Sequence, residues 1–248
     1  MTTQDFSNGF DTLVNSYSRF KDFDKRELLD SVEFNEYEKS LYLTKSQEDL
    51  VVALYSGRNP FGYSFEGTEE LRRYLAPLVL EKKEEPIENS SGTHIGVNTN
   101  STFFTLPSDV WYITYEAVNT TGDKPCDNKT GMMVVPVTQD EYHVLKKNPF
   151  RGPNNRRALR LDLADGVVEI VCKYKVSSYY IRYLRKPAPI ILENLPDGLT
   201  IEGKKEGKNE ESPCELHEAL HQKILENAVV MALQSKGYNI NKDNKDNN

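Results

Sequence analysis

The chain has 248 residues, of which 38 % are hydrophobic and 28 % are charged, and its formal net charge at pH 7 is −7. This length and composition predict a soluble protein with one large domain or two small ones. We expect no membrane partner and no secretion, because no run approaches the roughly 18 apolar residues of a membrane span and the first residues lack the pattern of a signal peptide.

Positive charge is concentrated in one segment of the chain. Residues 146–186 contain eleven Lys and Arg against three acidic residues, a local charge of +8 that leaves −15 for the rest. Such an uneven distribution of charge suits a protein whose copies bind acidic surface to basic surface, or one that binds a polyanion. A sheet face that is merely solvated explains the charge run equally well.

Residues 1–80 read as a helical region. Apolar residues at three- and four-residue spacing predict amphipathic helices near 10–20, 34–42 and 68–79. A further helix is predicted to begin at Thr44, which stands three residues before Gln47 in the pattern of a capping box, and to end at Gly57.

The periodicity then changes from about four to two, which predicts strands. Residues 81–100 are charged and then polar, and we interpret them as a linker or exposed loop before a β domain at 101–195. Pro187 and Pro189 mark an edge or an exit from the sheet, because neither can donate a ladder hydrogen bond. Within the β domain, strands are expected at 101–106, 109–118, 132–137, 158–163, 167–176 and 179–185, with a short capped helix at 138–147.

The C-terminal part is predicted to be a loop at 196–212, a helix at 213–237 and a flexible tail at 238–248. The apolar stripe of the last helix has to be covered, by its own domain or by a neighbouring subunit. We therefore predict an α+β fold in which the N-terminal helices and the C-terminal helix form a helical layer, with a mostly antiparallel β domain in the middle of the chain.

His217 and His221 lie in the pattern H-E-x-x-H, which on a helix can bind zinc for a metallopeptidase. A catalytic zinc needs a third protein ligand, and no convincing donor follows the two histidines. We therefore predict no catalytic residue, no cofactor and no metal, and interpret both histidines as flanking a buried stripe. The zinc site stays open as an alternative.

The segment YYIRYLRKP interleaves Tyr179, Tyr180 and Tyr183 with basic residues. Such a strand can stack on single-stranded nucleic acid, or it can form a protein interface. Because side chains alternate along a strand, its tyrosines would be split between two faces, which favours the interface. A nucleic-acid-binding module that uses the basic segment 146–186 remains the alternative.

Four segments together resemble the tail ring proteins of crAss-like bacteriophages: residues 37–57 (YEKSLYLTKSQEDLVVALYSG), 134–153, 181–192 and 214–233. The resemblance rests on their order, and it implies a structural protein of the virion rather than an enzyme. It further implies homododecameric rings, matched to the portal symmetry and stacked below the portal, which line a channel for DNA. Neighbouring ring proteins and the portal would be its partners after synthesis in the bacterial host cytoplasm.

A ring subunit needs two complementary side surfaces, because contacts that close under rotation use different surfaces on each copy. A net acidic wall would also let DNA pass without sequence-specific binding. The candidate subunit-interface residues are Arg151, Arg156, Arg157, Tyr180, Arg182, Arg185, Lys186, Val229, Val230 and Leu233.

Overall fold

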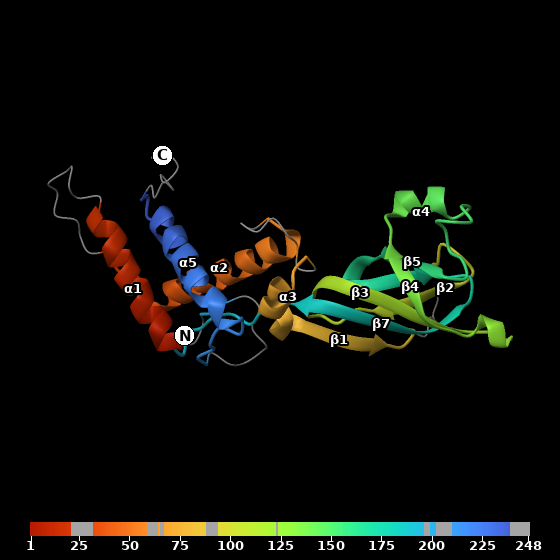
Figure 1. The fold of residues 1–248 in the computed structure, drawn as a ribbon, viewed down its shortest axis with the longest axis horizontal. Coiled ribbons are helices and arrows are strands. Elements are labelled where there is room, and N and C mark those ends of the chain that lie inside the picture. The colour runs from red at the N-terminus through yellow and green to blue at the C-terminus, as the bar shows by residue number, and fades with distance from the viewer. Residues whose placement is uncertain are drawn as a thin grey trace. The chain divides into compact units, whose positions relative to one another are not determined.

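The structure, a computed structural model, describes residues 1–20, 32–58, 64, 67–87, 94–122, 124–195, 199–201 and 210–238 (Figure 1). It divides into two compact units. The helical unit consists of residues 1–78 and 186–248, and the sheet unit consists of residues 79–185. The predicted α+β fold is confirmed, and both ends of the chain contribute helices to the helical unit. The predicted tail beyond Tyr238 and most of the predicted loop 196–212 lie outside the described residues.

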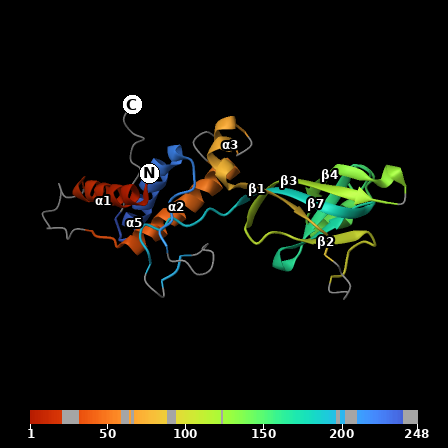
Figure 2. The ribbon, with the colours of Figure 1, turned by 90° about the horizontal axis from the view of Figure 1, so that it is seen from below.

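The helical unit is built around α1 (Thr3–Phe20), α2 (Glu36–Ser56) and α5 (His221–Ser235). As predicted, the last helix packs against the N-terminal helices (Figures 1 and 2). The Ser46 hydroxyl of α2 donates to the carbonyl of Ile224 in α5 over 2.7 Å. The shorter α3 (Glu69–Leu75) continues into the 3-10 turn η1 (Ala76–Leu78), and the turn η4 (Glu218–Leu220) leads into α5. None of the described helices combines the length and apolar character needed to cross a membrane.

The helix α2 is one continuous helix, so the predicted start at Thr44 is wrong. Its actual N-cap is Asn35, which forms a capping box with Glu38, and Gly57 ends it in the left-handed conformation at φ 77°. Instead of capping a helix, buried Thr44 binds the backbone of the segment that leaves the sheet. Its hydroxyl accepts from the N–H of Ile190 over 3.1 Å.

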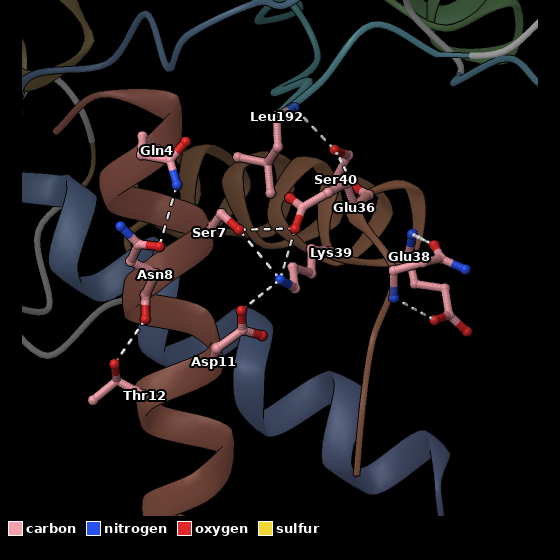
Figure 3. A network of polar contacts seen from close by, with 11 residues as sticks. Gln4, Ser7, Asn8, Asp11, Thr12, Glu36, Glu38, Lys39, Ser40 and Leu192 are labelled. Atoms are coloured by element: carbon pink, nitrogen blue, oxygen red, sulfur yellow. Dashed lines mark hydrogen bonds and ion pairs between the residues drawn. The ribbon is translucent and has the colours of Figure 1, made fainter. Parts of the chain in front are cut away.

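Two more polar residues of α2 contact the same segment. Ser40 accepts from the N–H of Leu192 over 3.0 Å (Figure 3), and the Gln47 amide donates to the carbonyl of Ala188 over 2.8 Å. Spacings of four and three residues place Ser40, Thr44 and Gln47 on one helix face. That face satisfies backbone groups that a neighbouring strand would otherwise bind.

A buried lysine joins α1 to α2 (Figure 3). The Lys39 ammonium lies 2.7 Å from a carboxylate oxygen of Asp11 and 2.8 Å from one of Glu36, and it donates to Ser7 over 3.2 Å. Its side chain is only 4 % exposed. Burial alone lowers the pKa of Lys39, but hydrogen bonds to Asp11 and Glu36 outweigh it and hold the pKa above its usual value. The ammonium is therefore a fixed link between the two helices.

The sheet unit contains seven strands in the order β1-β7-β3-β4-β5-β6-β2. All neighbours are antiparallel except β4 and β5, whose parallel connection contains α4 (Gln139–Leu145). The strands are β1 (Val79–Glu84), β2 (Ser101–Thr105), β3 (Val110–Thr121), β4 (Lys129–Pro136), β5 (Arg157–Asp162), β6 (Val167–Val171) and β7 (Lys175–Arg185). The 3-10 turns η2 (Pro125–Asp127) and η3 (Ala164–Gly166) connect β3 to β4 and β5 to β6.

The sheet curls on itself around an apolar core, because β2 at one edge also contacts β7 next to the other edge. One buried ion pair lies on the inner side: Arg160 is 2.8 Å from Glu116, which also accepts from the Tyr179 hydroxyl over 2.8 Å. The inner core consists of Phe104, Val118, Met132, Val134, Ala158, Val168, Ile170, Cys172, Val176, Tyr179, Ile181 and Tyr183. On the outer side, Tyr142 of α4 packs on Leu159, Leu161 and Val171 and so covers β5 and β6.

Three predicted boundaries in the sheet differ from the structure. Residues 81–84 belong to the edge strand β1 rather than to a linker, and an edge strand tolerates their charges because its side chains meet water. The predicted strand 167–176 is broken after Val171, and β7 begins at Lys175. The sheet ends at Arg185, so the two prolines mark an exit into the helical unit.

The predicted helix 213–237 begins later than expected. Residues 213–216 are not helical, and α5 starts at His221 after the turn η4. The reason is local, because the His217 ring accepts from the N–H of Ala219 over 3.3 Å and caps the turn. His217 and His221 are therefore not one turn apart on a continuous α-helix.

Candidate subunit-interface surface

The strand register brings the two separate groups of predicted arginines onto one surface of the sheet unit. Across five strands, Lys83 pairs with Tyr180, Tyr180 with Ala117, Ala117 with Met133, and Met133 with Arg157. Directly paired residues project to the same side of a sheet. Because the neighbours Tyr179, Val118 and Met132 belong to the inner core, this row projects outward. We call the row and the side chains around it the outer face.

Arg182 and Tyr115 extend the outer face beside this row. The Arg182 guanidinium lies 5.9 Å from the centre of the Tyr115 ring and 3.3 Å from a carboxylate oxygen of Glu81. The Lys83 ammonium lies 5.9 Å from the centre of the Tyr180 ring. These contacts hold the aromatic and basic side chains in defined positions at the surface.

A groove of about 570 Å³ runs between these side chains. Ala117 and Gly131 are its smallest lining residues, and Tyr115, Tyr180 and Arg182 line it as well. The Asn119 amide supports the site from the side, because it accepts from the N–H of Gly131 over 3.0 Å and donates to the Tyr180 hydroxyl over 3.4 Å. The groove therefore has a small-residue floor between aromatic and cationic side chains.

The loop before β5 presents an exposed aromatic ring at the other end of the outer face. Phe150 is 85 % exposed, and it lines a second groove of about 580 Å³ together with Met133 and Arg156. A hydrogen bond stabilises the loop, because the side-chain oxygen of Asn148 accepts from the N–H of Phe150 over 2.9 Å. A side chain at Gly152 would place its Cβ 2.4 Å from the carbonyl oxygen of Leu145, so this turn requires glycine.

Sequence reasoning missed three contributors to the outer face: Phe150, Met133 and Tyr115. Phe150 carried a usable signal, since a lone aromatic residue in the turn-like segment NPFRG has no apolar partner nearby. Met133 and Tyr115 carried none, because their outward position depends on which strands are paired.

The predicted interface residues occupy different environments. Arg156, Arg157, Tyr180 and Arg182 belong to the outer face, and Arg151 is exposed on the same loop as Phe150. The other predicted residues lie elsewhere: Arg185 is half-buried, Lys186 forms an ion pair with Glu48 of α2 at 3.0 Å, Val230 is half-buried, and Val229 and Leu233 are buried within their own chain.

The three tyrosines of β7 are split between the two faces, as the alternation of the strand predicts. Tyr179 and Tyr183 are buried, and the Tyr183 hydroxyl donates to Asp109 over 3.0 Å. Burial and this hydrogen bond raise the pKa of Tyr183 to about 12. Of these three rings, only Tyr180 is at the surface, so β7 does not offer a row of aromatic rings on which successive bases can stack.

The two histidines of the H-E-x-x-H pattern have different surroundings. His221 is buried: its Nε2 donates to the carbonyl of Leu216 over 2.9 Å, and its Nδ1 lies 3.0 Å from the amino nitrogen of Met1. His217 is exposed and packs on Tyr74, with ring centres 5.3 Å apart. In the part of the chain that the structure describes, no group of three or more His, Cys, Asp or Glu side chains could hold a metal ion. Because both nitrogens of His221 are engaged, this pair does not fit a zinc site.

Comparison with known proteins decides the family. Residues 1–244 match the family model described as phage tail ring protein 3/4. The chain belongs to this family. It is therefore a structural ring protein of a phage tail, and a component of the virion, as the resemblance implies.

Two relatives of this tail ring protein come from Bacteroides phage crAss001. "Ring protein 3" is 43 % identical over 240 residues, which cover 95 % of this chain and 96 % of the relative. "Ring protein 4/5" is 29 % identical over 241 residues, which cover 94 % and 92 %. Both alignments extend over the helical unit and the sheet unit of this chain.

Proposed function

We propose that copies of this tail ring protein form a closed ring in the neck or tail of the virion, below the portal, as part of the head-tail connector. Stacked rings then line the channel through which DNA leaves the capsid. The observation that carries this proposal is the match of residues 1–244 to a family of phage tail ring proteins. Synthesis takes place in the host cytoplasm, before assembly.

The proposed ring is a homododecamer that contacts neighbouring ring proteins and the portal. A closed ring needs two different surfaces on each copy. The outer face supplies one of them, and it contains four of the interface residues predicted from the sequence: Arg156, Arg157, Tyr180 and Arg182. Tyrosine and arginine are enriched at protein interfaces because they bury large contact areas.

The proposed role towards DNA is passage rather than binding. The net charge of −7 limits the number of phosphate contacts that release counterions, and such contacts dominate DNA affinity. Part of the basic segment 146–186 is also turned inward, since Arg160 pairs with Glu116 inside the sheet. Both observations favour a channel component over a nucleic-acid-binding module.

The proposal is tested by electron microscopy and mass measurement of the chain, purified alone and co-expressed with the neighbouring ring proteins of its phage. We expect closed rings in at least one preparation and the same protein in purified virions. A chain that stays monomeric in both preparations and is missing from virions contradicts the ring. Salt-sensitive DNA or RNA binding that falls when Arg182 and Arg185 are changed together contradicts the proposed passage and favours the nucleic-acid-binding module.

A further inference from the structure

We infer that the outer face of one copy binds the acidic helical unit of the next copy in the ring. This inference rests on the proposed ring and specifies which two surfaces meet in it. A second copy of this chain therefore occupies the outer face, and it binds there through its helical unit rather than through its own outer face.

The composition of the outer face is that of a protein interface. Tyr115 is 54 % exposed, Met133 is 49 % exposed and Phe150 is 85 % exposed, so apolar side chains reach the surface along its whole length. Arginines surround them, and Arg151 and Arg156 have no ion-pair partner among the described residues. Exposed aromatic and apolar groups within a basic rim are typical of a surface that becomes buried on assembly.

The two units of the chain carry opposite charge. The helical unit has a formal net charge of −8 and the sheet unit has +1, which together give the −7 of the chain. Copies that meet sheet unit to sheet unit would bring the arginines of two outer faces together, and like charges in contact are costly. Contact with a helical unit brings the arginines to carboxylates instead.

The helical unit has a surface that fits such a contact. A hollow of about 530 Å³ is lined by Glu69, Glu70, Arg73, Ala219 and the rings of Tyr74 and His217, so that carboxylates outnumber the one cation. The Glu69 side chain is 80 % exposed, although Arg73 lies 3.2 Å from it. Carboxylates beside aromatic rings bind a guanidinium by ion pairing and stacking together. This hollow is one place where an arginine of the neighbouring copy can bind.

The contact is tested by photo-crosslinking in assembled rings of the full chain. Met133, an exposed residue of the outer face, is replaced by the photoreactive residue p-benzoylphenylalanine. The covalent dimer is isolated on a denaturing gel and mapped by mass spectrometry. We expect the crosslinked peptides to come from residues 1–78 or 186–248 of the second copy. The matched control carries the same residue at Leu163, in the turn after β5, and we expect it to give a different or weaker dimer.

A charge reversal gives a second readout that does not depend on crosslinking. Arg182→Glu changes the outer face, whereas Lys175→Glu makes the same charge change at an exposed position at the other end of the same strand β7, beyond its register shift against β3. We expect Arg182→Glu to lower the assembled fraction by roughly tenfold and Lys175→Glu to leave it close to that of the unchanged protein. Circular dichroism checks that both variants are folded.

The outcomes separate this inference from the proposed function. Rings in which Met133 crosslinks to a sheet unit, to another ring protein or to nothing overturn the inference and leave the ring intact. Equal assembly of the two charge variants also overturns it. If no ring forms in any preparation, the proposed function fails and the inference fails with it.

Discussion

The imidazole of His221 is held in its neutral form by its surroundings. It is buried against Phe6, with ring centres 5.5 Å apart, and both ring nitrogens are in contact with backbone groups. Burial is the main reason that the pKa of His221 lies below 6.5, and the nearby amino group of Met1 lowers it further, while Glu218 acts in the opposite direction. A histidine kept neutral in the folded state makes folding sensitive to acid.

We expect the stability of the protein to fall as the pH drops below 6.5, and His221 to contribute to that fall. In this range the unfolded chain binds a proton at His221 that the folded chain does not bind, so acid favours unfolding. Urea unfolding at pH 7.0 and pH 5.0 measures the effect. The variant His221→Gln should lose less stability between these two values than the unchanged protein.

His217→Gln is the matched control for this experiment, because His217 is exposed and lies four residues away. It should keep the full dependence on pH. If both variants behave alike, the burial of His221 does not cause the acid sensitivity.

The helix α2 supports an extended segment of the chain through polar side chains. Ser40, Thr44 and Gln47 bind backbone groups of Leu192, Ile190 and Ala188, while Ile191 between them forms an antiparallel bridge with Ser212. A buried backbone N–H or carbonyl without a partner costs free energy comparable to a lost hydrogen bond. These three side chains thus allow the chain to pass from the sheet unit into the helical unit without that cost.

Thr44→Val tests this support, because valine has nearly the same shape but no hydroxyl. We expect it to lower the free energy of unfolding by about 1–3 kcal/mol, since Ile190 loses its partner in a buried site. Thr12→Val in α1 is the control, because its exposed hydroxyl donates to the carbonyl of Asn8 in the same helix. Its effect should stay within about 0.5 kcal/mol. Equal effects in urea unfolding would show that Thr44 has no special role.

The helices α4 and α2 show which hydrogen bonds the sequence could predict. The capping box of Thr138 and Glu141 in α4 is confirmed, because both hydrogen bonds join residues three apart. The identical pattern at Thr44 and Gln47 was misleading, since the partner of Thr44 is Ile190, 146 positions away. Local hydrogen bonds are readable from spacing, whereas a polar residue with a distant partner gives no local sign of it.

For the candidate surface, the alternation in β7 was sufficient to place Tyr180 and Arg182 on one face and Tyr179 on the other. The link from Tyr180 to Arg157 was not predictable, because it passes through the pairings of β7 with β3, β3 with β4 and β4 with β5. Strands far apart in sequence meet only when the sheet has formed, so the continuous outer face is a property of the topology.

At the scale of the whole molecule, the sheet unit is an insertion into the helical unit. The chain enters it through β1 and leaves it through β7, and these strands are neighbours in which Val79 pairs with Leu184. The two ends of the insertion are therefore as close as adjacent strands allow, about 5 Å. The unit also has its own inner core and its own covering helix α4.

We expect residues 79–185 to fold when expressed alone. The core lies within the unit, and cutting the chain at Leu78 and Lys186 leaves the paired strands β1 and β7 intact. A β-rich circular dichroism spectrum and one cooperative thermal transition are the expected results. The control fragment 101–185 lacks β1 and exposes the edge of β7, so it should melt at a lower temperature or aggregate. An unfolded 79–185 fragment would contradict the independence of the unit.

Because the chain enters and leaves the sheet unit through adjacent strands, changes inside this unit leave the residues on either side of it almost undisturbed. A segment held in this way can be swapped, lengthened or deleted during evolution while the remaining helices keep their mutual packing.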